Sequence, residues 1–325
     1  MKPMKAQVIV SETGPAGLEL QDVAAPQAAP GQYIVDVRSC GVCFPDLLMS
    51  QGKYQLRPPL PFTPGTEVAG VVTSAPDGGS YQVGDRVVVA SMLGGFGEQV
   101  AVVEQQLYPL PDLLSFDEGA ALGINFQTAL FALKLRAQTA PGEVVAVLGS
   151  AGGVGVASIL VAKAMGARVI AVVHRTGQEE MLRALGADEV VQLTDEWKDK
   201  VLELSDGGVD VLIDPVGGEV FDEALRTVGA DGRYVVIGFA AGGIPTVKLN
   251  RVLFRNISVV GAAWGEYIRT HPDVPGLLHD ELVEMIEAGM RPPVNHLYSL
   301  EDLPTALTDL AEGRVKGKAV IRISE

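Results

Sequence analysis

The sequence predicts an α/β protein in which a doubly wound parallel sheet is combined with a largely β-stranded region. Before about residue 120, short β-branched runs are separated by Gly and Pro turns. After it, apolar runs of strand length alternate with helix-like stretches over six expected strands. The length of 325 residues fits about two domains, at roughly 150 residues for each.

The composition excludes several classes of protein. Apolar residues make up 47% of the chain and charged residues 20%, which is enough to build a full core. The net charge of −15 repels phosphate backbones and anionic lipid heads, so nucleic-acid and membrane-surface binding are disfavoured. No apolar run approaches the roughly 20 residues that span a bilayer, and Met1–Val10 has no export pattern. We therefore expect a cytoplasmic protein.

The first region is expected to form short strands joined by turns. Its turn residues are Gly, Asp and Pro, as in Pro76–Gly79. The prolines between residues 58 and 64 argue against regular structure in that segment. The expected strands are Tyr33–Arg38, Val68–Ser74, Asp85–Val89 and Glu98–Val103.

The second region is expected to form a parallel sheet, because its Val- and Ile-rich runs lack alternation and suit strands buried on both faces. The expected strands are Val144–Leu148, Arg168–Val173, Glu189–Gln192, Val209–Ile213, Arg233–Ile237 and Ile257–Val260. The expected helices are Val154–Met165, Gln178–Leu185, Asp195–Leu204, Glu219–Val228 and Leu249–Phe254. A helix over Asp280–Ala288 and a strand over Lys318–Ile323 follow, and we expect them to rejoin the first region.

A glycine-rich turn follows the first of these strands and opens a helix. A dinucleotide fingerprint needs a tight turn, a glycine where the backbone approaches the pyrophosphate, and a glycine where the helix packs on the strand. Gly152 and Gly155 fit the last two roles, and Ser150 stands where the first glycine would be. Ser150 can make the turn and offer a hydroxyl to phosphate. The alternative is a purely structural turn.

The end of the next strand bears on which nicotinamide cofactor binds. An NAD site usually has an acid about 20 residues after the glycines, and here the chain reads His174-Arg175-Thr176. A guanidinium suits a 2′-phosphate, so the sequence favours NADPH. The alternative is a solvated Arg175 beside Glu179 or Glu180.

Together these features resemble the medium-chain dehydrogenase/reductase superfamily, and within it the zinc-free quinone oxidoreductase (zeta-crystallin-like) family. The resemblance implies a GroES-like β-rich catalytic domain over residues 1–122 and 262–325, with a Rossmann dinucleotide-binding domain over 123–261 inserted in it. It also implies that cofactor and substrate meet in a cleft. The stretches that carry it are Cys40–Leu47, Pro61–Gly70, Val83–Val87, Pro141–Gly155, Leu185–Asp188 and Gly317-Lys318.

The cysteine count and one substitution indicate that zinc is absent. Two cysteines, Cys40 and Cys43, are too few for a disulfide framework or a four-thiolate zinc lobe. Zinc-dependent relatives carry Gly-His-Glu where this chain reads Gly65-Thr66-Glu67, and threonine is a poor zinc ligand. Cys43, where many zinc-free relatives have Asn, either fills space beside the nicotinamide or is a reactive thiol.

The resemblance also implies roles for particular residues. Tyr54 resembles a family tyrosine near the nicotinamide, which could donate a proton, position a water or stack on substrate; otherwise it is an ordinary loop tyrosine. Together with Cys43 it forms the expected catalytic pair. The expected cofactor-binding residues are Thr128, Ser150, Ala151, Gly152, Gly153, Val154, His174, Arg175, Gly238, Phe239, Ala240, Asn250 and Lys316.

The expected activity is therefore zinc-independent transfer of hydride from NADPH to a quinone or an α,β-unsaturated carbonyl, since neither substrate needs a metal to polarise it. The alternatives are an enoyl-thioester reductase, a zinc alcohol dehydrogenase, and an NADPH-binding protein with a structural or RNA-binding role. An exposed last Rossmann strand, Asn256–Gly261, would need cover, so we expect a homodimer through it.

Overall fold

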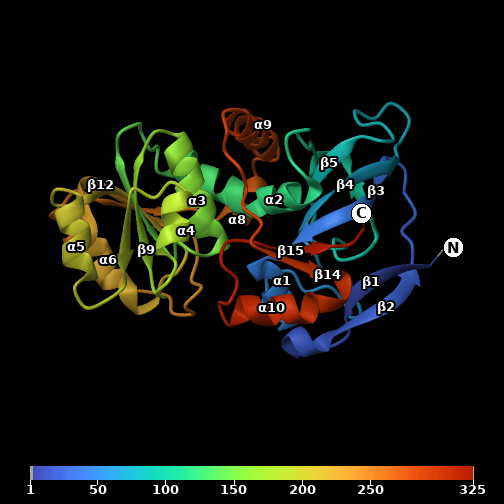
Figure 1. The fold of residues 1–325 in the computed structure, drawn as a ribbon, viewed down its shortest axis with the longest axis horizontal. Coiled ribbons are helices and arrows are strands. Elements are labelled where there is room, and N and C mark those ends of the chain that lie inside the picture. The colour runs from blue at the N-terminus through green and yellow to red at the C-terminus, as the bar shows by residue number, and fades with distance from the viewer. Residues whose placement is uncertain (1–2, 325) are drawn as a thin grey trace. The chain divides into compact units, whose positions relative to one another are not determined.

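The computed structural model describes residues 3–324, and the chain divides into two compact units (Figure 1). One unit holds the chain through Ile124 and again from Arg291 onward, and the other is Asn125–Met290. The nesting of one unit within the other agrees with the sequence prediction. None of the helices within residues 3–324 combines the length and apolarity that crossing a membrane requires.

The first unit is built on a mainly antiparallel sheet of seven strands. Its order is β14-β15-β3-β4-β5-β7, with β6 paired to β3, and β1 and β2 form a separate ribbon. The helices of this unit are α1 (Phe44–Ser50), α10 (Leu303–Ala311) and the first part of α2 (Phe116–Leu130). The strands are β1 (Pro3–Ile9), β2 (Leu18–Ala24), β3 (Gln32–Gly41), β4 (Glu67–Ser74), β5 (Arg86–Ala90), β6 (Gln99–Val103), β7 (Leu107–Pro109), β14 (His296–Ser299) and β15 (Ala319–Arg322).

The strands expected in this unit are all present, and four others were not predicted. The expected strands correspond to β3, β4, β5, β6 and β15, with ends that differ by at most three residues. The ribbon β1–β2 was missed because its two strands pair with each other, in register from Pro3 with Ala24 to Ile9 with Leu18. Most of β2 is half-buried or exposed, so its composition carries little strand signal. The short strands β7 and β14 were missed as well.

The second unit holds a six-stranded parallel sheet in the order β10-β9-β8-β11-β12-β13. The order reverses after β10, so right-handed crossovers place α3 and α4 on one face and α5 and α6 on the other (Figure 1). The strands are β8 (Val144–Leu148), β9 (Arg168–Val173), β10 (Glu189–Gln192), β11 (Val209–Asp214), β12 (Val228–Val236) and β13 (Ser258–Gly261). The helices are α3 (Gly153–Ala164), α4 (Glu179–Ala184), α5 (Trp197–Leu204), α6 (Phe221–Thr227), α7 (Leu249–Leu253), α8 (Trp264–Ile268) and α9 (Val274–Glu287). All six predicted strands of the doubly wound sheet are confirmed.

The boundaries of the units differ from those expected. Residues 262–290 were expected in the first unit, whereas they belong to the second. The ring of Phe131 lies 5.2 Å from that of Trp264 and 4.7 Å from that of Tyr267. Lys134 also forms an ion pair with Glu281. These side-chain contacts, rather than any feature of composition, join α8 and α9 to the segment that follows α2.

Candidate active site

The turn from β8 into α3 has the geometry of a dinucleotide-binding turn. Gly149 has a φ of +59°, a left-handed conformation that favours glycine. A Cβ on Gly155 would lie 2.3 Å from the carbonyl oxygen of Gly149, so this glycine allows the helix to pack on the turn. A Cβ on Gly152 would lie 3.4 Å from the same oxygen, and Gly152 is exposed. The free N–H groups at the start of α3 suit an anion there.

Ser150 contributes to the turn through its side chain. Its hydroxyl is fully buried and donates a hydrogen bond of 2.6 Å to the carbonyl of Val147. We expected this hydroxyl to donate to a phosphate. The structure does not fit that expectation, because the hydroxyl is buried and its hydrogen bond lies inside the turn. Ala151, Gly153 and Val154 remain half-buried at the surface of the turn, where their backbone can face a ligand.

His174 and Arg175 lie at the same edge of the sheet as the glycine turn. They directly follow the carboxyl end of β9, which is the neighbour of β8. Both side chains are exposed, and the carbonyl of His174 accepts a hydrogen bond of 2.6 Å from Gln192. In doubly wound sheets ligands bind outside the carboxyl ends of the strands, where the strand order reverses. The structure therefore places Arg175 at the edge that a dinucleotide would occupy.

Asp214 was missed by the sequence interpretation and organises the next loop along this edge. It ends β11 and is buried. Its Oδ1 accepts the backbone N–H groups of Val216 and Gly217 at 2.8 Å, and its Oδ2 accepts the Tyr234 hydroxyl at 2.6 Å. An acid closing an apolar strand before Pro-Val-Gly-Gly is the signal that could have revealed it. The turn that Asp214 fixes supports the loop of Gly238, Phe239 and Ala240, since Ala240 N donates to the carbonyl of Pro215.

Thr128 is brought to the glycine turn by its helix. A Cβ on Gly153 would lie 2.4 Å from the side-chain nitrogen of Asn125, so this end of α2 lies directly against the start of α3. Thr128 is three residues further on, hence on the same face of the helix as Asn125, and it is nearly buried. Asn125 was not among the expected site residues.

Asn250 and Lys316 are placed elsewhere. Asn250 lines a pocket with Leu225 and Arg226, which come just before β12 begins. That is the amino end of the strands, opposite the edge that carries the glycine turn, so the structure does not bring Asn250 to the other residues expected to bind the cofactor. Lys316 is an exposed residue of the first unit, whose backbone N–H donates to His296.

The first unit contains a buried cluster of Cys43, Glu67 and Lys318. The Cys43 thiol lies 2.9 Å from Glu67 Oε2, Lys318 Nζ lies 3.2 Å from Cys43 Sγ, and Lys318 forms an ion pair with Glu67. All three residues are at most 4% exposed. Strand β3 lies between β15 and β4 and passes Gly41 beside the cluster. A Cβ on Gly41 would lie 2.7 Å from Lys318 Cε, so a larger residue would displace the ammonium.

Burial and the neighbouring groups determine whether the thiol and the ammonium of this cluster carry a proton. Burial raises the pKa of the Cys43 thiol well above its usual range, the Glu67 charge adds to this, and Lys318 opposes it only in part. Burial by itself lowers the pKa of Lys318, but its ion pair and hydrogen bond with Glu67 oppose burial, and the net effect raises the pKa. The cluster therefore holds a neutral thiol and a charged ammonium. A buried, protonated cysteine is a poor nucleophile, which favours the space-filling interpretation of Cys43 over the reactive one.

Asp46 completes the polar surroundings of the cluster. Its Oδ2 accepts the backbone N–H of Cys43 at 2.8 Å, and the residue is fully buried. Its Oδ1 and the hydroxyl of Thr66 are buried without a hydrogen-bond partner within residues 3–324. Burial is the main cause that raises the pKa of Asp46 to about 7. Asp46 thus changes charge near neutral pH.

Replacing Asp46 with asparagine should flatten the pH dependence of stability. The folded state holds the Asp46 proton up to about pH 7, whereas the unfolded chain releases it near pH 4. Stability contributed by this group is complete below pH 4 and declines by about 1.4 kcal/mol per pH unit up to pH 7. Urea unfolding of both proteins from pH 4 to 8 measures the difference. Parallel curves for D46N and the unmodified chain would contradict it.

The donors at this place do not suit a catalytic zinc. Such a site takes three nitrogen, sulfur or carboxylate ligands and keeps a fourth position open. Here Lys318 already binds the Cys43 thiol and the Glu67 carboxylate, and Thr66 offers only a hydroxyl. Over residues 3–324, no three His, Cys, Asp or Glu side chains gather as metal ligands.

Tyr54 lies in the loop after α1 and is half-buried against the core of the first unit. The helix α1 begins directly after Cys43, so the chain passes from the ionic cluster to Tyr54 through a single short helix. Both expected catalytic residues, Cys43 and Tyr54, therefore lie in one short segment of the first unit.

Two family models match the chain. Residues 29–112 match the alcohol dehydrogenase GroES-like domain, and residues 153–282 match the zinc-binding dehydrogenase family. The first match lies in the first unit and the second match in the parallel-sheet unit. The second family is named for zinc binding, but that name applies to its members in general. In this chain the donors Cys43 and Glu67 are bound to Lys318.

Individual proteins resemble the chain over almost its whole length. Quinone oxidoreductase-like protein 2 of Bos taurus is 35% identical over 311 residues, covering 94% of this chain and 89% of that protein. A probable oxidoreductase from Mycobacterium abscessus is 44% identical, with a TM-score of 0.93 and 99% coverage of both chains. The quinone oxidoreductase of Thermus thermophilus, solved alone and with NADPH, is 34% identical, with a TM-score of 0.83 and coverage of 98% and 100%.

Fold and sequence thus agree on one relationship. The nested arrangement of a GroES-like unit and a doubly wound parallel sheet, the glycine turn and the full-length similarity all point to the same group of proteins. The chain belongs to the medium-chain dehydrogenase/reductase superfamily and, within it, to the quinone oxidoreductase-like family.

Proposed function

We propose that the chain is an NADPH-dependent oxidoreductase that transfers hydride, without a metal, to a quinone or an α,β-unsaturated carbonyl. The observation that carries the metal-free part is the buried ammonium of Lys318, bound to both Cys43 and Glu67. A carbonyl without a Lewis acid is a poor hydride acceptor, whereas quinones and conjugated alkenes are already electrophilic. The NADPH complex of the Thermus thermophilus relative supports the choice of cofactor.

The residues of the second unit would bind the cofactor. The glycine turn and the start of α3 would face the pyrophosphate, and Arg175 would bind a 2′-phosphate. Thr128 and the loop Gly238–Ala240 are proposed to contact the nicotinamide end. The cofactor supplies the hydride, and the protein aligns it and excludes water. In this proposal Cys43 fills space as a neutral thiol.

The proposal is tested by following NADPH oxidation with a panel of quinones, enones and enoyl-CoA esters, with and without a chelator. Turnover of a quinone or an enone that is unchanged by chelation supports it. Activity lost on chelation and restored by zinc would refute the metal-free mechanism. Turnover restricted to enoyl thioesters, or NADPH binding without turnover of any compound, would replace the proposed function with the corresponding alternative.

Replacing Arg175 with alanine should weaken NADPH binding by about tenfold and leave NADH binding nearly unchanged. A charge-assisted contact to phosphate contributes roughly 1.5–3 kcal/mol, and NADH lacks that phosphate. Calorimetric titration with each cofactor measures both affinities. Arg183→Ala is the matched control, because Arg183 lies on the next helix and pairs with Glu189. Equal losses for NADPH and NADH in R175A would show that Arg175 does not recognise the 2′-phosphate.

Replacing Tyr54 with phenylalanine should lower kcat by about 10²-fold or more if its hydroxyl donates the proton that follows hydride transfer, since general-acid catalysis contributes about 10²–10⁴-fold. The KM for substrate should change little, because the ring remains. Tyr298→Phe is the control, since it lies in a different segment of the first unit and its hydroxyl bonds Asp309. Turnover of Y54F at the unmodified rate would assign the proton to water.

The proposed enzyme is a cytoplasmic homodimer that pairs through β13. This strand is last in its sheet and is bonded to β12 on one side, and Val259 on it is 41% exposed. A bare edge strand favours pairing with a second copy. Light scattering should give the mass of two chains, and Val259→Lys should reduce it towards one. Cell fractionation tests the location.

A further inference from the structure

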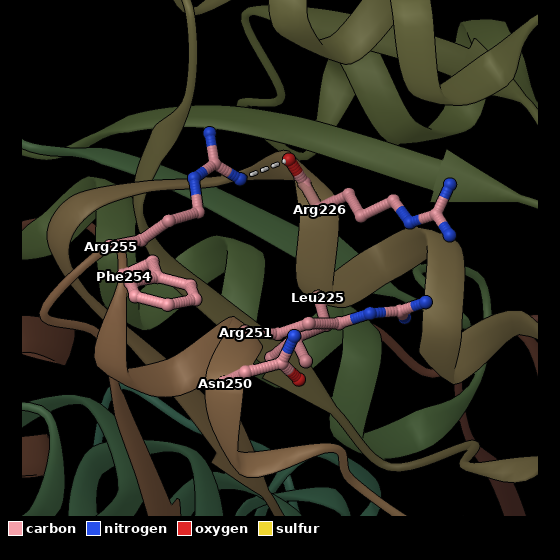
Figure 2. A pocket seen from close by; sticks show the side chains of 6 residues that line it. All are labelled: Leu225, Arg226, Asn250, Arg251, Phe254 and Arg255. Atoms are coloured by element: carbon pink, nitrogen blue, oxygen red, sulfur yellow. Dashed lines mark hydrogen bonds between the residues drawn. The ribbon is translucent and has the colours of Figure 1, made fainter.

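The second unit has a pocket that is rich in arginine and lies apart from the edge with the glycine turn. It has a volume of about 360 Å³, and its lining includes Arg226 at the end of α6 and Arg251 and Arg255 in and after α7. Leu225, Asn250 and Phe254 complete the lining, so none of the six lining residues is acidic (Figure 2). The volume is at the small end of the range for ligand pockets.

The pocket is distinct from the proposed cofactor site because of the sheet topology. Residues 225 and 226 precede β12, and residues 254 and 255 precede β13, so both pairs lie at the amino ends of parallel strands. The glycine turn follows the carboxyl end of β8 in the same sheet. A ligand in the arginine pocket would therefore occupy the opposite edge from a dinucleotide.

The three guanidinium groups keep most of their donors available. Arg255 Nη1 donates to the backbone carbonyl of Arg226 at 2.8 Å, which the dashed line in Figure 2 marks. Arg251 Nη1 lies 2.7 Å from Asp222, close enough for an ion pair but without the direction of a hydrogen bond. Arg226 is exposed, and in Figure 2 its side chain extends the same way as that of Arg251. Each guanidinium has five N–H donors.

Three arginines lining one pocket are unexpected in a chain with a net charge of −15. The protein has 40 acidic against 25 basic residues, yet none of the residues that line this pocket is acidic, and Asp222 pairs with Arg251 from outside the lining. Like charges brought together disfavour each other unless an anion joins them. Guanidinium groups bind phosphate oxygens in pairs, and the exposed ring of Phe254 offers an apolar face for a planar group.

We propose that this pocket binds a small phosphate-bearing anion, of the diphosphate class, through Arg226 and Arg251, while Arg255 is held on the backbone carbonyl of Arg226. Asn250 supplies an additional amide at the same pocket. If the ligand carries a nucleobase or another planar ring, Phe254 contacts that ring. The site is independent of the proposed reductase activity.

The test is calorimetric titration of NADP⁺-saturated protein with inorganic pyrophosphate and, separately, with uridine diphosphate. Saturation keeps both probes out of the glycine turn. Arg226→Gln should weaken pyrophosphate binding by about tenfold, since a hydrogen bond to a charged group contributes roughly 1.5–3 kcal/mol. Arg226→Lys should weaken it less, because a point charge remains. Arg269→Gln, an exposed arginine paired with Glu266, is the matched control and should bind as the unmodified chain does.

The two probes separate a bare phosphate site from a nucleotide site. Tighter binding of uridine diphosphate than of pyrophosphate, lost in Phe254→Ala, would assign a ring-bearing ligand. Equal binding of both, unaffected by F254A, would assign the phosphate alone. No binding of either probe, or equal binding by R226Q and R269Q, would overturn the proposal. A change of mass in R226Q without any effect on pyrophosphate would instead assign the arginines to contacts between copies.

Discussion

Replacing Lys318 with methionine should lower the free energy of unfolding by about 3–5 kcal/mol, the cost of removing one partner from a buried ion pair. The variant leaves the Glu67 carboxylate in a site that is shielded from water and that lacks its cation. Methionine has nearly the same length as lysine, so lost packing contributes little.

Urea denaturation at pH 7 measures this loss in the free energy of unfolding, and calorimetry of thermal unfolding is the second measurement. Lys200→Met is the control, because Lys200 forms an exposed pair with Glu203 and should change stability by less than about 0.5 kcal/mol. The double variant K318M/E67Q should recover most of the loss, since it removes both charges from the interior. A loss below about 1 kcal/mol in K318M would show that the Glu67 charge is compensated by other groups.

The second large effect is expected in the glycine turn, where alanine at Gly155 should reduce stability and alanine at Gly152 should reduce cofactor affinity. Gly155→Ala should destabilise the second unit by about 1–3 kcal/mol, because its new methyl meets the backbone of the turn, which cannot rotate aside. Gly152→Ala should leave stability within about 0.5 kcal/mol, because its φ of −83° suits any residue and its methyl has room. The same methyl should still raise the Kd for NADPH by about tenfold or more, since it occupies the approach of the pyrophosphate.

Unfolding curves and NADPH titrations of both variants separate the two roles. Gly276→Ala on α9 is the control. Apart from its chain neighbours and the backbone of its own helix, no atom of residues 3–324 lies within 4 Å of its added Cβ, so it should stabilise the helix by about 0.5–1 kcal/mol without changing cofactor affinity. If G152A bound NADPH as tightly as the unmodified chain, the pyrophosphate would not lie against this turn.

Several features of the fold were predictable because their signal is local in the sequence. The strands β8, β9, β11 and β12 are short apolar runs, and parallel strands buried on both faces need that composition. The turn at Gly149–Gly155 carries its conformational demand in the glycines themselves. The ribbon β1–β2 was not predictable in this way, since each strand depends on the other for its hydrogen bonds.

The site was predictable only in part. Arg175 and the glycine turn lie at one edge of the sheet because both follow parallel strands, and the carboxyl ends of such strands share an edge. Asn250 lies away from the other expected cofactor residues, because α7 is a short helix whose position depends on its packing beside the end of α6. Asp214 was overlooked, since an acid at the end of a strand looks like a solvated residue until its bonds to Val216 and Gly217 are seen.

By itself, the sequence determined the two kinds of sheet, the nesting of one unit within the other, the glycine turn and the lack of a histidine beside Glu67. Only the tertiary structure shows that Lys318, rather than a histidine, lies beside Glu67. Lys318 lies 251 positions from Glu67 in the chain and reaches it because β15 and β4 both pair with β3. Backbone preferences act over a few residues, whereas a buried ion pair depends on strand register, which is fixed only when the whole sheet forms.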